Sequence, residues 1–321
     1  PVRRARPGEG FHRRGDQRVL DLFGGRATIG LNARPIFFTN AGALRAPWRI
    51  LLFLLFTAVA VQVCAVLAGP LLEWAFVHTG LRGVSTAPWI ECVALLIGTG
   101  ASLRWIDKRP WSYVWLGREA ASTSRIVLGF AIGAAAIGLP IALLLSARWL
   151  RDAGGPTASL WAAGIRISML LLPAALLEEL LFRGYPLAVL HGLWGWRWAV
   201  VVTSAAFGAV HLANAGATAA STALVTLAGV FLAAVLVRTR SLYAAWAAHF
   251  AWNWTMAVVF HTAVSGLPLE SPRYRYVDAG PDWATGGEWG PEGGVPAGVG
   301  MIAGIAYLIA RRRSAPRREE T

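Results

Sequence analysis

The chain has 321 residues, of which 56% are hydrophobic and only 15% are charged. Soluble domains carry about 25% charged residues, so this composition excludes an ordinary soluble enzyme and predicts a surface that faces lipid. The formal charge of +13 would suggest nucleic-acid binding in a soluble protein. In a membrane protein it indicates basic loops and tails lying against anionic lipid headgroups, and we expect no nucleic-acid partner. Cys64 and Cys92 cannot form a disulfide framework and lack a metal-binding C-x-x-C spacing.

Residues 1–49 are rich in Arg, Gly and Pro, and we predict that they form a basic, mostly disordered cytoplasmic tail. Eight apolar segments follow, and a spanning helix requires about 20 mostly apolar residues. They cover residues 50–69, 89–103, 126–147, 165–182, 198–212, 217–237, 242–264 and 295–310. The sequence therefore predicts an all-α fold: a polytopic membrane helix bundle over residues 50–310, with about eight transmembrane helices. Residues 311–321 are predicted to form a second basic cytoplasmic tail.

Basic residues gather in one set of linkers and in both tails, whereas the loop over residues 265–294 is acidic. The basic linker residues are Arg104, Lys108, Arg109, Arg118, Arg125, Arg183, Arg197, Arg238 and Arg240. Because cytoplasmic loops carry an excess of Lys and Arg, we predict that both termini are cytoplasmic and that this loop is outside. Arg148 and Arg151 lie on the predicted outer side, although the rule places basic residues mainly in the cytoplasm. The Ala- and Arg-rich composition suggests a G- and C-rich bacterial genome, and hence a multi-pass protein of a bacterial plasma membrane.

Two glycine pairs have the G-x-x-x-G spacing, Gly129 with Gly133 and Gly300 with Gly304. This spacing permits two membrane helices to pack closely. It is also common in apolar helices that have no such contact, so the sequence leaves both interpretations open.

The fourth segment ends with two adjacent carboxylates, Glu178 and Glu179, followed by Arg183. A carboxylate near the centre of a membrane helix costs about 2.5–3.5 kcal/mol on insertion scales, so the protein must compensate these charges. Glu179 and Arg183 are four residues apart on one helix face, which predicts an ion pair between them. Glu178 points away from that face and lacks this partner. Alternatively, both carboxylates lie at the cytoplasmic end of the helix and reach water.

Later segments carry two further polar clusters. The fifth segment contains Phe207 and His211, and the seventh contains His249 and Asn253, four residues apart on one helix face. Taken alone, His211 could be a packing residue. The pair on the seventh segment could equally be a hydrogen-bonding patch between helices.

Together, the three clusters provide the groups that peptide hydrolysis by an activated water requires. Glu178 and His211 could hold and deprotonate the water. His249 and Asn253 could donate hydrogen bonds to the oxyanion of the tetrahedral intermediate. The predicted ion pair of Glu179 could fix the orientation of the first carboxylate and contribute to substrate binding.

The order of these motifs resembles the CPBP family. The matching motifs are Glu178-Glu179-x-x-x-Arg183, Phe207-x-x-x-His211 and His249-x-x-x-Asn253. The family includes type II CAAX prenyl endopeptidases and bacterial proteins linked to bacteriocin processing or self-immunity. The resemblance implies an intramembrane endopeptidase with its core at residues 165–260 and a site that opens toward the cytoplasm. It also implies that Glu178 and His211 activate the water, that His249 and Asn253 form the oxyanion hole, and that Glu179, Arg183 and Phe207 support them.

Members of this family have been described both as metalloproteases and as glutamic peptidases. If zinc binds, its ligands would be Glu178, His211 and His249. However, the sequence lacks H-E-x-x-H, and no two histidines share a helix with four-residue spacing. We therefore favour a metal-free glutamate mechanism and expect no cofactor.

The predicted function is hydrolysis of a membrane-associated peptide, either CAAX-like or of the bacteriocin or leader type. A non-catalytic membrane scaffold or a self-immunity protein is the alternative, although such a protein would be free to lose these costly charges. A proton-coupled carrier also uses intramembrane Glu and His, but carriers often contain inverted repeats, and none is visible. The G-x-S-x-G motif of serine hydrolases and the P-loop are both absent from the sequence.

Overall fold

The structure is a computed structural model that describes residues 34–152, 154, 160–269 and 276–313. Residues 1–43 and 44–321 are two separate units. In the first unit the described helix is α1 (Arg34–Phe37). Most of the predicted N-terminal tail and residues 314–321 lie outside the described residues, so the predicted contacts of the tails with anionic lipid remain predictions. The second unit contains the helical bundle and every predicted site residue.

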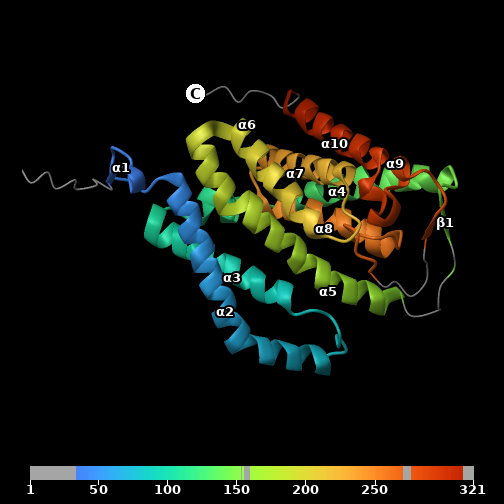
Figure 1. The fold of residues 1–321 in the computed structure, drawn as a ribbon, viewed down its shortest axis with the longest axis horizontal. Coiled ribbons are helices and arrows are strands. Elements are labelled where there is room, and N and C mark those ends of the chain that lie inside the picture. Colours follow the sequence, from blue (N-terminus) through green and yellow to red (C-terminus); the bar gives the residue numbers. More distant parts are fainter. Residues whose placement is uncertain (1–33, 153, 155–159, 270–275, 314–321) are drawn as a thin grey trace, which may run out of the picture. The chain divides into compact units, whose positions relative to one another are not determined.

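The bundle is built from long helices joined by short helical turns (Figure 1). The long helices are α2 (Ala46–His78), α3 (Ala87–Ala101), α4 (Thr123–Ser146), α5 (Leu160–Glu179), α6 (Tyr185–Val210), α7 (Ala219–Thr239), α8 (Leu242–Trp254) and α10 (Val295–Arg313). The short helix α9 covers Asp282–Thr285, and strands β1 (Leu150–Asp152) and β2 (Tyr276–Asp278) pair antiparallel. The predicted all-α class is confirmed.

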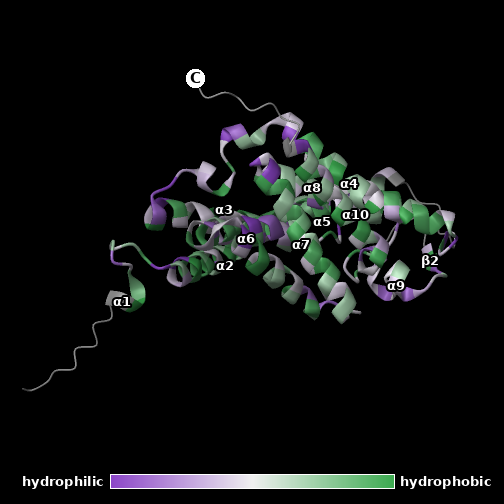
Figure 2. Ribbon diagram, turned by 90° about the horizontal axis from the view of Figure 1, so that it is seen from above, coloured by the Kyte–Doolittle hydropathy of each residue, from purple (hydrophilic) through white to green (hydrophobic). Residues whose placement is uncertain are grey.

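Four of the described helices are long and apolar enough to cross a membrane. They are Ala46–His78, Ala87–Asp107, Thr123–Ser146 and Ala219–Thr239, while α10 provides a shorter apolar helix over Val295–Arg311. In the most apolar 18-residue stretch of α2, only 11% of the residues are buried. Most of this helix therefore presents apolar side chains outward, as lipid contact requires. Hydrophobic residues predominate along the helices, and hydrophilic residues lie largely in loops and at helix ends, for example near α9 and β2 (Figure 2). A polytopic membrane bundle is confirmed, whereas the number eight and the cytoplasmic termini remain predictions.

Both glycine pairs lie at close helix contacts. A methyl group on Gly129 or Gly133 of α4 would overlap the carbonyl oxygen of Ala244 or Ala248, respectively, on α8. On α10, a methyl group at Gly300 would overlap the backbone of Ala136, and one at Gly304 would lie 2.7 Å from the ring of Phe231. The backbone of α8, which carries His249, is therefore held directly against α4.

The chain around the acidic motif differs from the prediction. The segment predicted to end at residue 182 continues through a π-helical turn (Leu180–Gly184) into α6 without leaving the bundle. The first half of α6 was not predicted, because Gly195, with a φ of 74°, interrupts this helix and breaks its periodicity. Consequently Glu178 and Glu179 do not lie at a helix end that faces water, and Arg183 does not lie in a cytoplasmic linker.

Candidate active site

The predicted ion pair between Glu179 and Arg183 is present and fully buried. Nη1 of Arg183 donates a hydrogen bond to Oε1 of Glu179 over 3.0 Å, and both side chains are 0% exposed. The guanidinium also stacks over the ring of Phe207, 4.1 Å from its centroid, which adds a cation–π interaction in a dry environment. The alternative in which both carboxylates reach water is therefore wrong for Glu179, whereas the side chain of Glu178 is 29% exposed.

His249 connects this ion pair to the third motif. Its Nδ1 atom lies 2.9 Å from Oε1 of Glu179. Because an ionised carboxylate only accepts hydrogen bonds, Nδ1 of His249 must be the donor. The sequence predicts the pairing of Glu179 with Arg183 but not this second contact, since His249 is 70 residues away in the chain.

His211 is fixed in the same manner by a different acceptor. The chain leaves helix α6 at Val210, and His211 begins a 3₁₀ turn (His211–Ala213). Nδ1 of His211 lies 2.7 Å from the carbonyl oxygen of Phe207, and a carbonyl can only accept. In its neutral form, His211 therefore has a lone pair on Nε2 that is free to accept a proton.

The two imidazoles converge on Glu178. Oε2 of Glu178 lies 4.0 Å from Nε2 of His211 and 3.7 Å from Nε2 of His249. This oxygen is buried and has no hydrogen-bond partner among the described residues. Gaps of this width are too long for a direct hydrogen bond, but one water with bonds of about 2.8 Å can bridge each of them.

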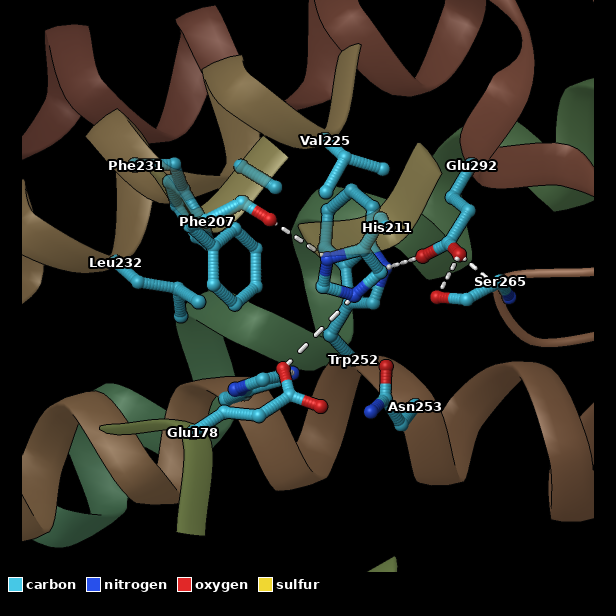
Figure 3. Close-up of a pocket in the computed structure, with 12 residues that line it drawn as sticks. Glu178, Phe207, His211, Val225, Phe231, Leu232, Trp252, Asn253, Ser265 and Glu292 are labelled. Atoms are coloured by element: carbon cyan, nitrogen blue, oxygen red, sulfur yellow. Dashed lines mark hydrogen bonds and ion pairs between the residues drawn. The ribbon is translucent and has the colours of Figure 1, made fainter. Parts of the chain in front are cut away.

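Five of the predicted residues line one pocket. Glu178, Phe207, His211, His249 and Asn253 all belong to its wall, and the polar side chains point into a common space (Figure 3). The Asn253 amide makes no hydrogen bond to another described residue, so it is free to bind a ligand. Glu179 and Arg183 lie behind this wall and support it.

π-Helical turns flank two of the three motifs. One such turn directly follows Glu179, and a second (Thr255–Val259) begins two residues after Asn253. Such turns interrupt the regular backbone ladder and occur often at functional sites. In this structure they end the helical stretches from which Glu178 and Asn253 project into the pocket.

Two pocket residues, Ser265 and Glu292, come from a loop that was predicted to lie apart from the site. Oε1 of Glu292 accepts hydrogen bonds from the backbone N–H and from Oγ of Ser265, over 2.6 and 2.7 Å. Asn214 donates to the carbonyl oxygen of Ser265 and so joins this loop to the turn after His211. The predicted position of the loop on the outer side of the membrane remains a prediction, and the structure brings Ser265 and Glu292, near its two ends, into the pocket. No local sequence signal distinguishes Glu292 from the other acidic residues of this loop.

The donor groups do not form a preorganised metal site. Among the residues that the structure describes, no group of three or more His, Cys, Asp and Glu side chains is arranged to hold a metal ion. In a tetrahedral zinc site, bonds of about 2.0–2.2 Å place neighbouring ligand atoms roughly 3.4 Å apart, and the separations of 3.7 and 4.0 Å around Glu178 are only moderately wider. The metal-free mechanism therefore remains a prediction.

A comparison with known families identifies the domain. Residues 159–255 match the family model described as type II CAAX prenyl endopeptidase, Rce1-like. The matched segment is an Rce1-like domain. It contains all three motifs and ends two residues after Asn253. No curated protein and no solved structure matches the chain.

The Rce1-like domain confirms the predicted family and indicates a peptidase. With the apolar helices of the bundle, it makes this chain an integral membrane protein and, in general terms, an intramembrane CAAX-type endopeptidase. Ser265 and Glu292 lie outside the matched residues. One wall of the pocket is therefore supplied by a part of the chain that the family match does not cover.

Proposed function

We propose that this protein hydrolyses a peptide bond of a membrane-associated peptide in a bacterial plasma membrane, with Glu178 as the general base. The observation that carries the proposal is the convergence of Nε2 of His211 and of His249 on Oε2 of Glu178, at 4.0 and 3.7 Å. A water between Glu178 and His211 can donate one proton to each of them. Its oxygen lone pairs then face the scissile carbonyl carbon.

In the first step, the water oxygen bonds to the carbonyl carbon while one of its protons moves to Glu178. The carbonyl π electrons move onto oxygen and form an oxyanion. Asn253 can donate to this oxyanion from its free amide. His249 can donate from Nε2 only as an imidazolium, because its Nδ1 proton is already engaged with Glu179. The Glu179 carboxylate balances the positive charge of that ring.

In the second step, the tetrahedral intermediate collapses and the carbon–nitrogen bond breaks. Glu178 returns its proton to the leaving nitrogen, so that the products are a carboxylic acid and an amine. The carboxylate of Glu178 is thereby regenerated for the next cycle. Because Glu178 both takes the proton from the water and returns it to the leaving nitrogen, the proposed cycle balances without a cofactor.

The proposal is tested with the protein purified in detergent and a library of membrane-associated peptides, with products identified by mass spectrometry. Wild type is expected to produce defined cleavage sites. His211→Ala is expected to slow cleavage by about 10²-fold, the lower end of the contribution of general acid–base groups, because the water loses the ring that positions it, without loss of the folded protein. Full activity in that variant would contradict the role of His211. The absence of cleavage across the library would instead favour a non-catalytic scaffold or self-immunity protein.

A further inference from the structure

Glu292 is a third carboxylate in the pocket, and the proposed reaction does not use it. Its side chain is only 7% exposed. Its Oε2 accepts a hydrogen bond from Nε1 of Trp252 over 3.0 Å, and its Oε1 accepts the two hydrogen bonds from Ser265. All three donors are neutral, so they fix the position of the carboxylate but leave its charge unbalanced.

An unbalanced buried charge is expensive, and hydrogen bonds from neutral donors compensate it only in part. Arg183 and Glu179 show how the same protein balances the charge of a buried carboxylate with a cation. For Glu292, no cation lies within ion-pair distance among the described residues, and no Lys or Arg belongs to the described wall of the pocket.

The backbone that holds Glu292 is also unusual. Ser265, which donates two of the three hydrogen bonds, has a φ of 50°, in the left-handed region that non-glycine residues rarely adopt. Such backbone positions persist only where surrounding contacts hold them, and they cluster at binding sites. The hydrogen bond from Asn214 to the Ser265 carbonyl is one of those contacts. Glu292 is therefore held in a fixed position at the pocket wall.

Part of the pocket wall is apolar. It includes Val225, Phe231 and Leu232 of α7, and Figure 3 shows Phe231 and Leu232 across the pocket from Glu292. A ligand that fits such a wall has an aliphatic portion and a positive end. A lysine side chain has this character, because its methylene stem packs on apolar surface while its ammonium group pairs with a carboxylate.

We infer that Glu292 determines substrate specificity by binding a basic side chain close to the scissile bond. This inference rests on the proposed peptidase function and adds the class of substrate: a peptide with Lys or Arg near the cleaved bond. The specificity arises from a loop outside the matched domain.

The experiment compares two peptides that differ only in a Lys or a norleucine beside the cleavage site. Wild type is expected to cleave the Lys peptide with a kcat/KM at least about tenfold higher than that for the norleucine peptide. A hydrogen bond between charged groups is strong enough to produce a preference of at least that size. Glu292→Gln is expected to remove this preference, measured as the ratio of kcat/KM for the two peptides. The control variant is Glu288→Gln, an exposed carboxylate of the same loop that is not part of the pocket wall and should retain the preference.

Binding of the same two peptides to the Glu178→Gln variant separates this inference from the proposed function. Tighter binding of the Lys peptide without any cleavage by wild type would contradict the peptidase and support the role of Glu292. Equal cleavage of both peptides by wild type would overturn the role of Glu292 and leave the peptidase intact. This wild-type comparison decides the matter even if Glu292→Gln does not fold.

Discussion

Oε1 of Glu179 lies 2.9 Å from Nδ1 of His249 and accepts a second hydrogen bond from Nη1 of Arg183. One buried oxygen thus connects the end of α5 to the middle of α8. The contact fixes the tautomer of His249 and points its Nε2 atom toward Glu178. Glu179 is therefore a positioning residue, and the ion pair predicted from the sequence is only half of its role.

Replacing Arg183 by Ala should destabilise the protein more than it changes the chemistry. The substitution strands the buried carboxylate of Glu179, and breaking a buried pair costs about 3–5 kcal/mol. Unfolding of the purified protein in detergent measures this loss. Arg118→Ala, at an exposed site, is the matched control. Its free energy of unfolding should lie within about 0.5 kcal/mol of that of wild type. An equally small effect at Arg183 would contradict a buried, stabilising pair.

The double variant Glu179→Leu with Arg183→Met should separate stability from activity. Apolar residues of similar volume often replace a buried ion pair without loss of stability, so we expect the free energy of unfolding to recover toward that of wild type. Cleavage should remain impaired, because His249 no longer has an acceptor at Nδ1. Recovery of both properties would show that Glu179 does not position His249.

Asn253→Ala should lower kcat and leave KM nearly unchanged. The Asn253 amide has no other hydrogen bond among the described residues, so its proposed role is to bind the oxyanion. Loss of one such donor costs about 10²–10³-fold in rate. Steady-state kinetics on a peptide from the library measures both constants. A rise in KM with an unchanged kcat would instead assign Asn253 to substrate binding.

Gly133→Ala should destabilise the bundle, whereas Gly138→Ala on the same helix should not. A methyl group at Gly133 would overlap the carbonyl oxygen of Ala248, but one at Gly138 would lie 3.4 Å from a methyl group of Thr255. Overpacking costs about 1–3 kcal/mol. Because Ala248 precedes His249, we also expect lower activity in the first variant. Equal melting temperatures would argue against the close contact of α4 with α8.

The predicted orientation can be tested by cysteine labelling in cells, with Cys64 and Cys92 replaced by Ala. Val277 is 51% exposed on β2, and a cysteine there should react with a membrane-impermeant reagent in intact cells. A cysteine at the exposed Arg104 position should react only after the membrane is permeabilised. The reverse pattern would invert the topology that the positive-inside rule predicts.

Local patterns in the sequence predicted the helices and the motif residues, because periodicity and spacing are properties of short segments. The Glu179–Arg183 pair could be predicted for the same reason. The contact of Glu179 with His249 could not, since it depends on how two helices pack. Likewise, the charge pattern of residues 265–294 indicated a side of the membrane, but it contained no information on where Glu292 lies.

The most direct test of water activation by Glu178 is the rate of peptide cleavage by wild type and by Glu178→Gln, each with and without a zinc chelator. The isosteric amide retains the shape of the side chain but cannot take a proton from water. We predict that wild type cleaves equally well with the chelator, and that Glu178→Gln is at least about 10²-fold slower in both conditions. Normal cleavage by Glu178→Gln, or loss of wild-type cleavage on chelation, would contradict a water activated by Glu178 without a metal.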